Sequence, residues 1–270
     1  MYIYIETENT MKVPYSKYKK ALADLAEKSN MRILPTIVAS NIYNLSSNDY
    51  LGLMSNPELG ERFMKEYPDS LWKFSSSSSR LLTGNSKPYQ DLEACVARTF
   101  GREACLVFNS GYHANIGILP ALTSKRDLIV ADKLIHASLI DGIKLSQAEF
   151  KRYNHLDYVQ LEQILETGRD LYEHIFIVSE SIFSMDGDKC DLQKLVALKK
   201  KYDCYLYIDE AHAIGVNGDI GLGLAEEQNC INDIDFIIGT FGKALASYGA
   251  YIVCDEVIKQ YLINTARSMI

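Results

Sequence analysis

Short apolar segments alternate along much of the chain with longer segments whose apolar residues recur at helical spacing. We expect the short segments to be buried strands, and they cover residues 104–108, 128–130, 174–178, 205–208 and 236–238. The segments of helical period cover residues 88–100, 112–122, 136–146, 157–166 and 191–202. Strand, helix and strand in repetition predict an α/β fold, in which helices flank a mostly parallel sheet on both faces.

The first 85 residues follow a less regular pattern. Residues 15–28 have the apolar spacing of an amphipathic helix, and an extended connection follows them. The serine run 75–79 is typical of a flexible linker, although the residues directly after it are not. We therefore expect three parts: a helix and arm over 1–45, a large domain over 46–254 and a final helix over 255–270.

The composition excludes several classes of protein. The 270 residues include 28 basic and 35 acidic side chains, and no Lys/Arg-rich run, so nucleic acid is not expected as a partner. No apolar stretch approaches the roughly 18 residues that span a bilayer, and the start lacks a signal-peptide pattern, which predicts a cytoplasmic protein without membrane contact. The six cysteines form no C-x-x-C pair and no zinc-like cluster, so we expect reduced, mostly buried thiols and no metal site.

Ligands of open parallel sheets bind at the carboxyl ends of the strands, and Asp209 directly follows a predicted strand. Asp209 with His212 could hold a cationic ring nitrogen or a metal, or Asp209 could simply cap the next segment. Asp-Glu-Ala-His after a strand is also the magnesium motif of many helicases. That alternative requires G-x-x-x-x-G-K-[ST], whereas Gly242-Lys243 is preceded by Ile237 and followed by Ala244 at the defining positions.

Other polar residues follow the remaining strands. Lys243 lies among small residues, where desolvation would lower its pKa as a Schiff-base lysine requires, although a surface lysine on a glycine turn is the alternative. Gly111 opens a helix whose free N–H groups suit a phosphate, unless it is an ordinary turn. His136 could be a core histidine, and Ser184 a turn residue.

Seven ordered blocks carry a resemblance to a known family. They are SSNDYLGL (46–53), SRLLTGN (79–85), FNSGYHAN (108–115), HASLIDG (136–142), ESIFSMDGD (180–188), DEAHAIGVNGDIG (209–221) and GTFGKALASYGA (239–250). Together they resemble the α-oxoamine synthases, a branch of the fold-type I enzymes that use pyridoxal 5'-phosphate (PLP). The resemblance makes residues 46–254 a PLP-binding large domain.

The resemblance also implies roles for the residues at the strand ends. Lys243 would bind PLP covalently and later move the Cα proton of the amino-acid substrate. Asp209 would pair with the ring nitrogen and His212 with the phenolate oxygen, while His136 would stack on the ring and contact the substrate.

Further residues are implied around the cofactor and the substrate. Gly111, Tyr112, Ser184 and Thr240 would surround the phosphate and the ring. Arg32 resembles the family's N-terminal substrate arginine.

The implied reaction is a decarboxylative condensation of L-alanine with a pimeloyl thioester, carried by CoA or an acyl-carrier protein. Sister synthases that use glycine or serine with another acyl donor are the alternative, and a DEAH-type nucleotidase is a more distant one. The family works as a homodimer and continues into a small C-terminal domain that binds the amino-acid carboxylate. We expect that domain to be missing here, which leaves an inactive cofactor-binding fragment as a further alternative.

Overall fold

The computed structural model describes residues 15–34, 44–67 and 75–269. The chain divides into two compact units, residues 1–46 and 47–270. In the first unit, helix α1 (Ser16–Glu27) confirms the helix predicted over 15–28. None of its residues is buried, and Leu22 on its apolar side is 51% exposed.

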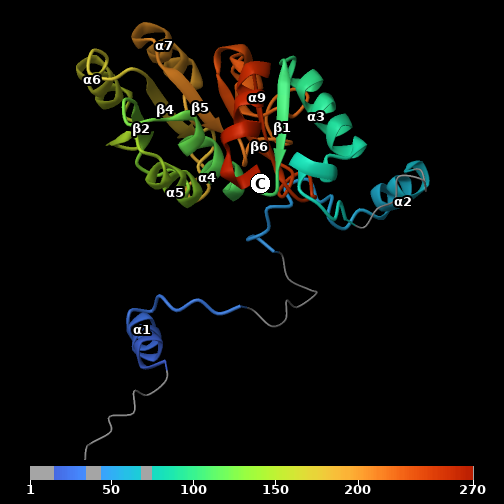
Figure 1. The fold of residues 1–270 in the computed structure, drawn as a ribbon. Helices are drawn as coiled ribbons and strands as arrows, with labels where there is room; N and C mark the ends of the chain where they lie inside the picture. Colours follow the sequence, from blue (N-terminus) through green and yellow to red (C-terminus); the bar gives the residue numbers. More distant parts are fainter. Residues whose placement is uncertain (1–14, 35–43, 68–74, 270) are drawn as a thin grey trace, which may run out of the picture. The chain divides into compact units, whose positions relative to one another are not determined.

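The second unit contains a seven-stranded sheet in the order β1-β7-β6-β5-β4-β2-β3, with helices around it (Figure 1). The strands are β1 (Ala104–Phe108), β2 (Leu128–Asp132), β3 (Glu149–Tyr153), β4 (Ile175–Glu180), β5 (Tyr205–Asp209), β6 (Phe236–Thr240) and β7 (Ala250–Cys254). Strand β7 is antiparallel to both of its neighbours, and all other pairs are parallel. The predicted α/β class with a mostly parallel sheet is confirmed.

The helices of this unit are α2 (Pro57–Glu66), α3 (Lys87–Phe100), α4 (Gly111–Leu122), α5 (Ala137–Leu145), α6 (Tyr158–Gly168), α7 (Leu192–Tyr202), α8 (Leu224–Glu227) and α9 (Glu256–Thr265). Helices α3 to α7 begin and end close to the predicted positions, and α9 lies within the predicted final helix, whereas α2 and α8 were not predicted. Side-chain caps explain several starts: Ser110, Asp157 and Asp191 each accept a hydrogen bond from the backbone N–H three residues later. Shorter helical turns are η2 (Arg80–Gly84), η3 (Ile231–Asp233) and η4 (Arg267–Met269). Helix α4 packs against α5 and α9, whereas α6 packs against α7.

Two strands were not predicted from the sequence. Strand β3 lies at the edge of the sheet and is rich in charged residues, a composition typical of protected edges but not of buried strands. Strand β7 is fully buried, but no helix separates it from β6. A pattern of alternating strands and helices cannot reveal a strand that returns antiparallel through a turn.

The core of the unit fills the space on both sides of the sheet. Strands β1, β2, β4, β6 and β7 are buried along their whole length. All six cysteines are free thiols and all but Cys95 are buried, which confirms the expectation for them. Within the described ranges, no helix is long and apolar enough to cross a membrane.

Candidate active site

A cavity of ≈ 180 Å³ lies where the parallel strands β4, β5 and β6 end. The register pairs Glu180 with Asp209 across β4 and β5, so two carboxyl groups end adjacent strands. Thr240 ends β6. The cavity is lined by Gly111, Tyr112, Asn115, His136, Ser138, Glu180, Asp209, Ala211, His212, Thr240 and Lys243.

Lys243 lies in the turn between β6 and β7 and is half-buried. Burial lowers the pKa of its amine, and the negative charges of Asp209 and Glu180 oppose that shift. Its Nζ lies 2.6 Å from Nε2 of His212. A lowered pKa increases the neutral fraction of the amine, which is the form that attacks a carbonyl.

His212 connects Lys243 with the segment that precedes α2. Its Nδ1 lies 2.7 Å from the hydroxyl of Tyr50. Burial, followed by the charge of Lys243, lowers the pKa of the imidazole to about 4. The ring is therefore neutral near pH 7. When Lys243 carries its proton, the ammonium can only donate to Nε2, and the ring proton then lies on Nδ1, which faces the Tyr50 hydroxyl.

Asp209 is only 7% exposed. Its Oδ1 accepts from the backbone N–H of Ala211 at 3.0 Å, and its Oδ2 accepts from the side-chain amide of Asn115 at 2.9 Å. Both carboxylate oxygens are thus held in place. A fixed, buried carboxylate of this kind suits a cationic ring nitrogen.

Glu180 is buried beside Asp209 and accepts a hydrogen bond from the backbone N–H of His136. Burial, with the charge of Asp209 as the next cause, raises the pKa of Glu180 to about 8. Near pH 7 the Glu180 carboxyl is therefore mostly protonated. The His136 ring caps α5, and its Nδ1 lies 2.8 Å from Oγ of Ser138.

The Aminotransferase class I and II family profile matches residues 40–270. The chain belongs to this family. A relative from Pasteurella multocida (strain Pm70), with the provisional name 8-amino-7-oxononanoate synthase, is 56% identical over 263 residues, which is 94% of this chain and 68% of that protein.

Two solved structures that resemble the chain narrow its assignment within the family. The 8-amino-7-oxononanoate synthase of Francisella tularensis is 33% identical with a TM-score of 0.70, over 86% of this chain and 64% of that one. A serine palmitoyltransferase variant from S. paucimobilis with a bound PLP–myriocin aldimine is 25% identical with a TM-score of 0.79, over 95% of this chain and 69% of that one. The chain is a PLP-dependent enzyme of the α-oxoamine synthase branch.

The cavity fits PLP in the chemistry of its groups. A buried carboxylate at Asp209 and a lysine with a lowered pKa face one space. Helix α4 begins at the same space, and its first N–H groups have no partner within the helix, which suits a phosphate. A Cβ added at Gly111 would meet no heavy atom within 4 Å, so the helix start has open space beside it.

Most residues predicted for the PLP site are brought together in this cavity. They are Gly111, Tyr112, His136, Asp209, His212, Thr240 and Lys243. Ser184 is exposed and does not line it. Arg32 is exposed in the unit formed by residues 1–46. The roles of Ser184 and Arg32, like those of the cavity residues, stay predictions.

Sequence reasoning missed Asn115, Ser138 and Glu180, although each lies inside a block that carried the family resemblance. Glu180 ends β4, and the strand-end rule would have found it if the predicted strand had not stopped at 178. Asn115 lies one helical turn beyond the start of α4, and no local pattern indicates that it contacts Asp209.

One group in the described part of the chain has the donor types of a metal site: Asp127, Glu173 and His174. Nδ1 of His174 lies 2.9 Å from Asp127, and Glu173 pairs with Arg126 at 2.7 Å. These contacts within the protein account for the cluster.

Proposed function

We propose that this chain condenses L-alanine with a pimeloyl thioester, with loss of CO₂, to form 8-amino-7-oxononanoate for biotin biosynthesis. The observation that carries the proposal is the 56% identity to the Pasteurella multocida relative over 94% of the chain. That match spans the segments that bring Lys243 and Asp209 to one cavity. The structural likeness to the Francisella tularensis synthase supports the same reaction.

PLP, when bound, supplies an electron sink for the negative charge that develops at Cα of the amino acid. Lys243 holds the cofactor and, as a neutral amine, removes the Cα proton and returns it at the end. The lowered pKa of Lys243 supports both tasks. Asp209 keeps the ring nitrogen protonated, since its carboxylate stabilises the positive charge.

The other cavity residues orient these groups. His212 remains neutral because its pKa is lowered to about 4. Once Lys243 is bound to the cofactor and no longer donates to Nε2, the neutral ring would donate its N–H to the cofactor oxygen without adding a second positive charge. His136 lies at the start of α5 and would cover the ring face, and the N-terminus of α4 would hold the phosphate. The carrier of the acyl group is CoA or an acyl-carrier protein, and the homodimer and the cytoplasmic location stay predictions.

The experiment combines turnover with covalent capture. The PLP-loaded chain is mixed with L-alanine and pimeloyl-CoA, and thiol release, CO₂ and product mass are measured. Borohydride should fix PLP to the wild-type chain but not to Lys243→Ala. The matched control is Lys189→Ala, because Lys189 is half-exposed and pairs only with Glu227 in the described structure. Retention of fixed PLP in Lys243→Ala would overturn the assignment of Lys243.

A second candidate is a sister reaction that joins L-serine to a longer acyl thioester. Its support is the higher TM-score to the S. paucimobilis serine palmitoyltransferase, 0.79 against 0.70 for the Francisella tularensis synthase. The same assay separates the two when L-alanine, glycine and L-serine are compared with pimeloyl-CoA and palmitoyl-CoA. Turnover with L-serine and palmitoyl-CoA, and none with L-alanine, would replace the first proposal with the second.

A further inference from the structure

A continuous chain of hydrogen bonds runs behind the cavity. The Tyr207 hydroxyl donates to Oδ1 of Asn115 at 2.6 Å. The side-chain nitrogen of Asn115 donates to Asp209 and to Ser138, both at 2.9 Å. Oγ of Ser138 lies 2.8 Å from Nδ1 of His136. Tyr207, Asn115 and Ser138 are at most 1% exposed, so water does not compete for these bonds.

The direction of each bond follows from the chemistry of the groups. An ionised Asp209 can only accept, so the NH₂ group of Asn115 must face it and the amide oxygen must face Tyr207. Tyr207 then has to donate. Burial raises the pKa of Tyr207 well above its ordinary value, which keeps its proton in place.

The same logic fixes the proton on His136. The second N–H of Asn115 goes to Oγ of Ser138, so the Ser138 hydroxyl can direct its own proton to Nδ1 of His136. The backbone N–H of Ser138 also donates to Nδ1, at 3.2 Å. With two donors directed at it, Nδ1 is an acceptor, and a neutral His136 carries its proton on Nε2.

We propose that Asn115 is a positioning residue that fixes the Asp209 carboxylate and, through Ser138, holds His136 in the Nε2–H tautomer. The buried Asn115 amide thereby orients a carboxylate at the end of β5 and an imidazole ring at the start of α5. The inference rests on the proposed PLP site, but on no choice of substrate. It gives His136 and His212 opposite tautomers when Lys243 is protonated, because the Lys243 ammonium then donates to Nε2 of His212 and leaves the ring proton on Nδ1.

Histidine tautomers provide a test that needs neither cofactor nor substrate. The chain is labelled with ¹⁵N-histidine, and long-range ¹H–¹⁵N correlation spectra identify the protonated nitrogen of each ring at a pH where the rings are neutral. His136→Gln assigns its signals among those of the five histidines. We expect Nε2–H for His136 and Nδ1–H for His212. An Nδ1–H tautomer at His136 in the wild type would overturn the proposal.

Two variants then test separately the bond from Asn115 to Asp209 and the path from Asn115 through Ser138 to His136. Ser138→Ala removes the hydroxyl donor but keeps the backbone N–H that also faces Nδ1, so it should raise the Nδ1–H fraction of His136 without abolishing the Nε2–H form. Its loss of PLP affinity, measured by equilibrium dialysis, should be smaller than that of Asn115→Ala, because the bond from Asn115 to Asp209 remains. Asn115→Ala should release His136 and also weaken PLP binding by about 10-fold or more, because Asp209 loses a hydrogen bond to a charged group. A fixed tautomer in both variants, or unchanged PLP affinity in Asn115→Ala, would overturn it.

Controls exclude a general loss of structure. Asn264→Ala removes an amide that donates to its own helix, and Thr167→Ala removes a hydroxyl with the same kind of local contact. Both should leave the His136 signals and the PLP affinity unchanged. If Asn115→Ala fails to fold, Tyr207→Phe tests the same amide by deleting one donor, and it should broaden or shift the His136 signals. No change in those signals would count against the network.

Discussion

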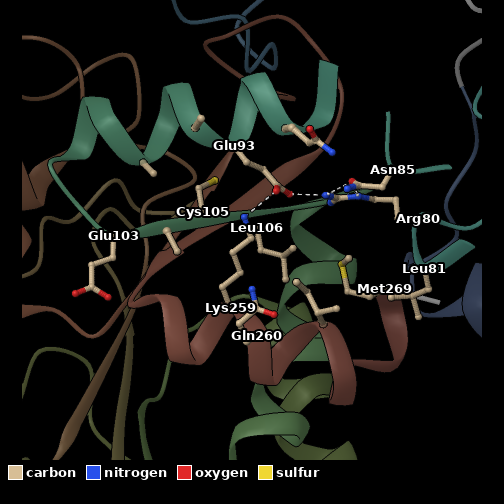
Figure 2. Close-up of a pocket in the computed structure, with 15 residues that line it drawn as sticks. Arg80, Leu81, Asn85, Glu93, Glu103, Cys105, Leu106, Lys259, Gln260 and Met269 are labelled. Atoms are coloured by element: carbon tan, nitrogen blue, oxygen red, sulfur yellow. Dashed lines mark hydrogen bonds and ion pairs between the residues drawn. The ribbon is translucent and has the colours of Figure 1, made fainter. Parts of the chain in front are cut away.

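Two clusters of charged side chains in the same unit differ in how many basic groups face their buried carboxyl groups. Beside β1, Glu93 is 4% exposed, and its oxygens face Arg80 at 2.8 Å and Lys259 at 3.0 Å (Figure 2). At the strand ends, the cavity lining contains two carboxyl groups, Glu180 and Asp209, but one basic side chain, the half-buried Lys243. The first cluster holds three parts of the chain together, whereas the second shifts the pKa values of its own members.

The charged groups of the Glu93 cluster also have hydrogen-bond partners in the backbone. Oε1 of Glu93 also accepts from the backbone N–H of Val107 at 2.9 Å, and Arg80 donates to the carbonyl of Val107. The ≈ 410 Å³ cavity beside it is thus lined by charges that already have partners. The strand-end cluster instead leaves a lysine with a lowered pKa and a carboxyl with a raised one, which is the arrangement expected of a reactive site.

The largest expected effect is the loss of turnover in Asp209→Asn. An amide cannot stabilise a protonated ring nitrogen as a carboxylate does, so kcat should fall by about 10³-fold. The free energy of unfolding of the apo chain should change by less than about 1 kcal/mol, because the amide oxygen can still accept from the backbone N–H of Ala211. Steady-state kinetics and urea unfolding measure the two quantities. A variant that kept kcat and lost stability would erase the contrast with Glu93.

Glu93→Ala should have the opposite profile. Removing the buried carboxylate leaves the partly buried Arg80 and Lys259 without this partner, which should cost about 3 kcal/mol of unfolding free energy. Urea unfolding at one fixed pH measures the loss. The kcat of the fraction that remains folded should stay within about two-fold of the wild type, since the strand-end cavity does not include Glu93. A loss below about 1 kcal/mol would show that the cluster is not a structural centre.

The pH dependence of stability sharpens the comparison at Glu180. Its pKa is raised from 4.5 to about 8 in the folded chain, so the folded state binds the proton more tightly than the unfolded state. The stabilisation of the folded state by this tighter proton binding is fully present below about pH 4.5 and is lost as the pH rises through about 8. Between about pH 6 and about pH 9 we expect this stabilisation to fall by about 3 kcal/mol.

Glu180→Gln should remove this part of the slope. Glu210, with a pKa raised to about 7 by burial, and Lys243, with a lowered pKa, also titrate with folding, so the test is the difference between the wild-type and variant curves. Urea unfolding across the pH range measures that difference. Parallel curves would mean that Glu180 is not protonated in the folded chain.

The sequence indicated the strand-end residues Asp209 and Lys243 but not the Glu93 cluster. Asp209 and Lys243 follow apolar strands, and the ends of parallel strands meet at one edge whatever the exact register. The Glu93 cluster could not be predicted, because Lys259 is 166 residues away from Glu93 and the contact depends on β7 and α9 returning to β1. Asn115 reaches Asp209 across 94 residues for the same reason. Local sequence patterns indicate which helix or strand carries a residue. Which distant residue it contacts depends on how the elements are connected and packed.

The smallest expected effect belongs to an ion pair on the same helix as Glu93. Lys87 and Asp91 of α3 lie 2.6 Å apart, but their side chains are 67% and 59% exposed. Water screens this pair, and a lysine in the first turn of a helix opposes the helix dipole. Lys87→Ala should therefore change the unfolding free energy by no more than about 0.5 kcal/mol, measured by urea unfolding beside Glu93→Ala. Because both variants alter one helix, a similar loss in the two would mean that α3 itself, and not the burial of Glu93, determines the cost.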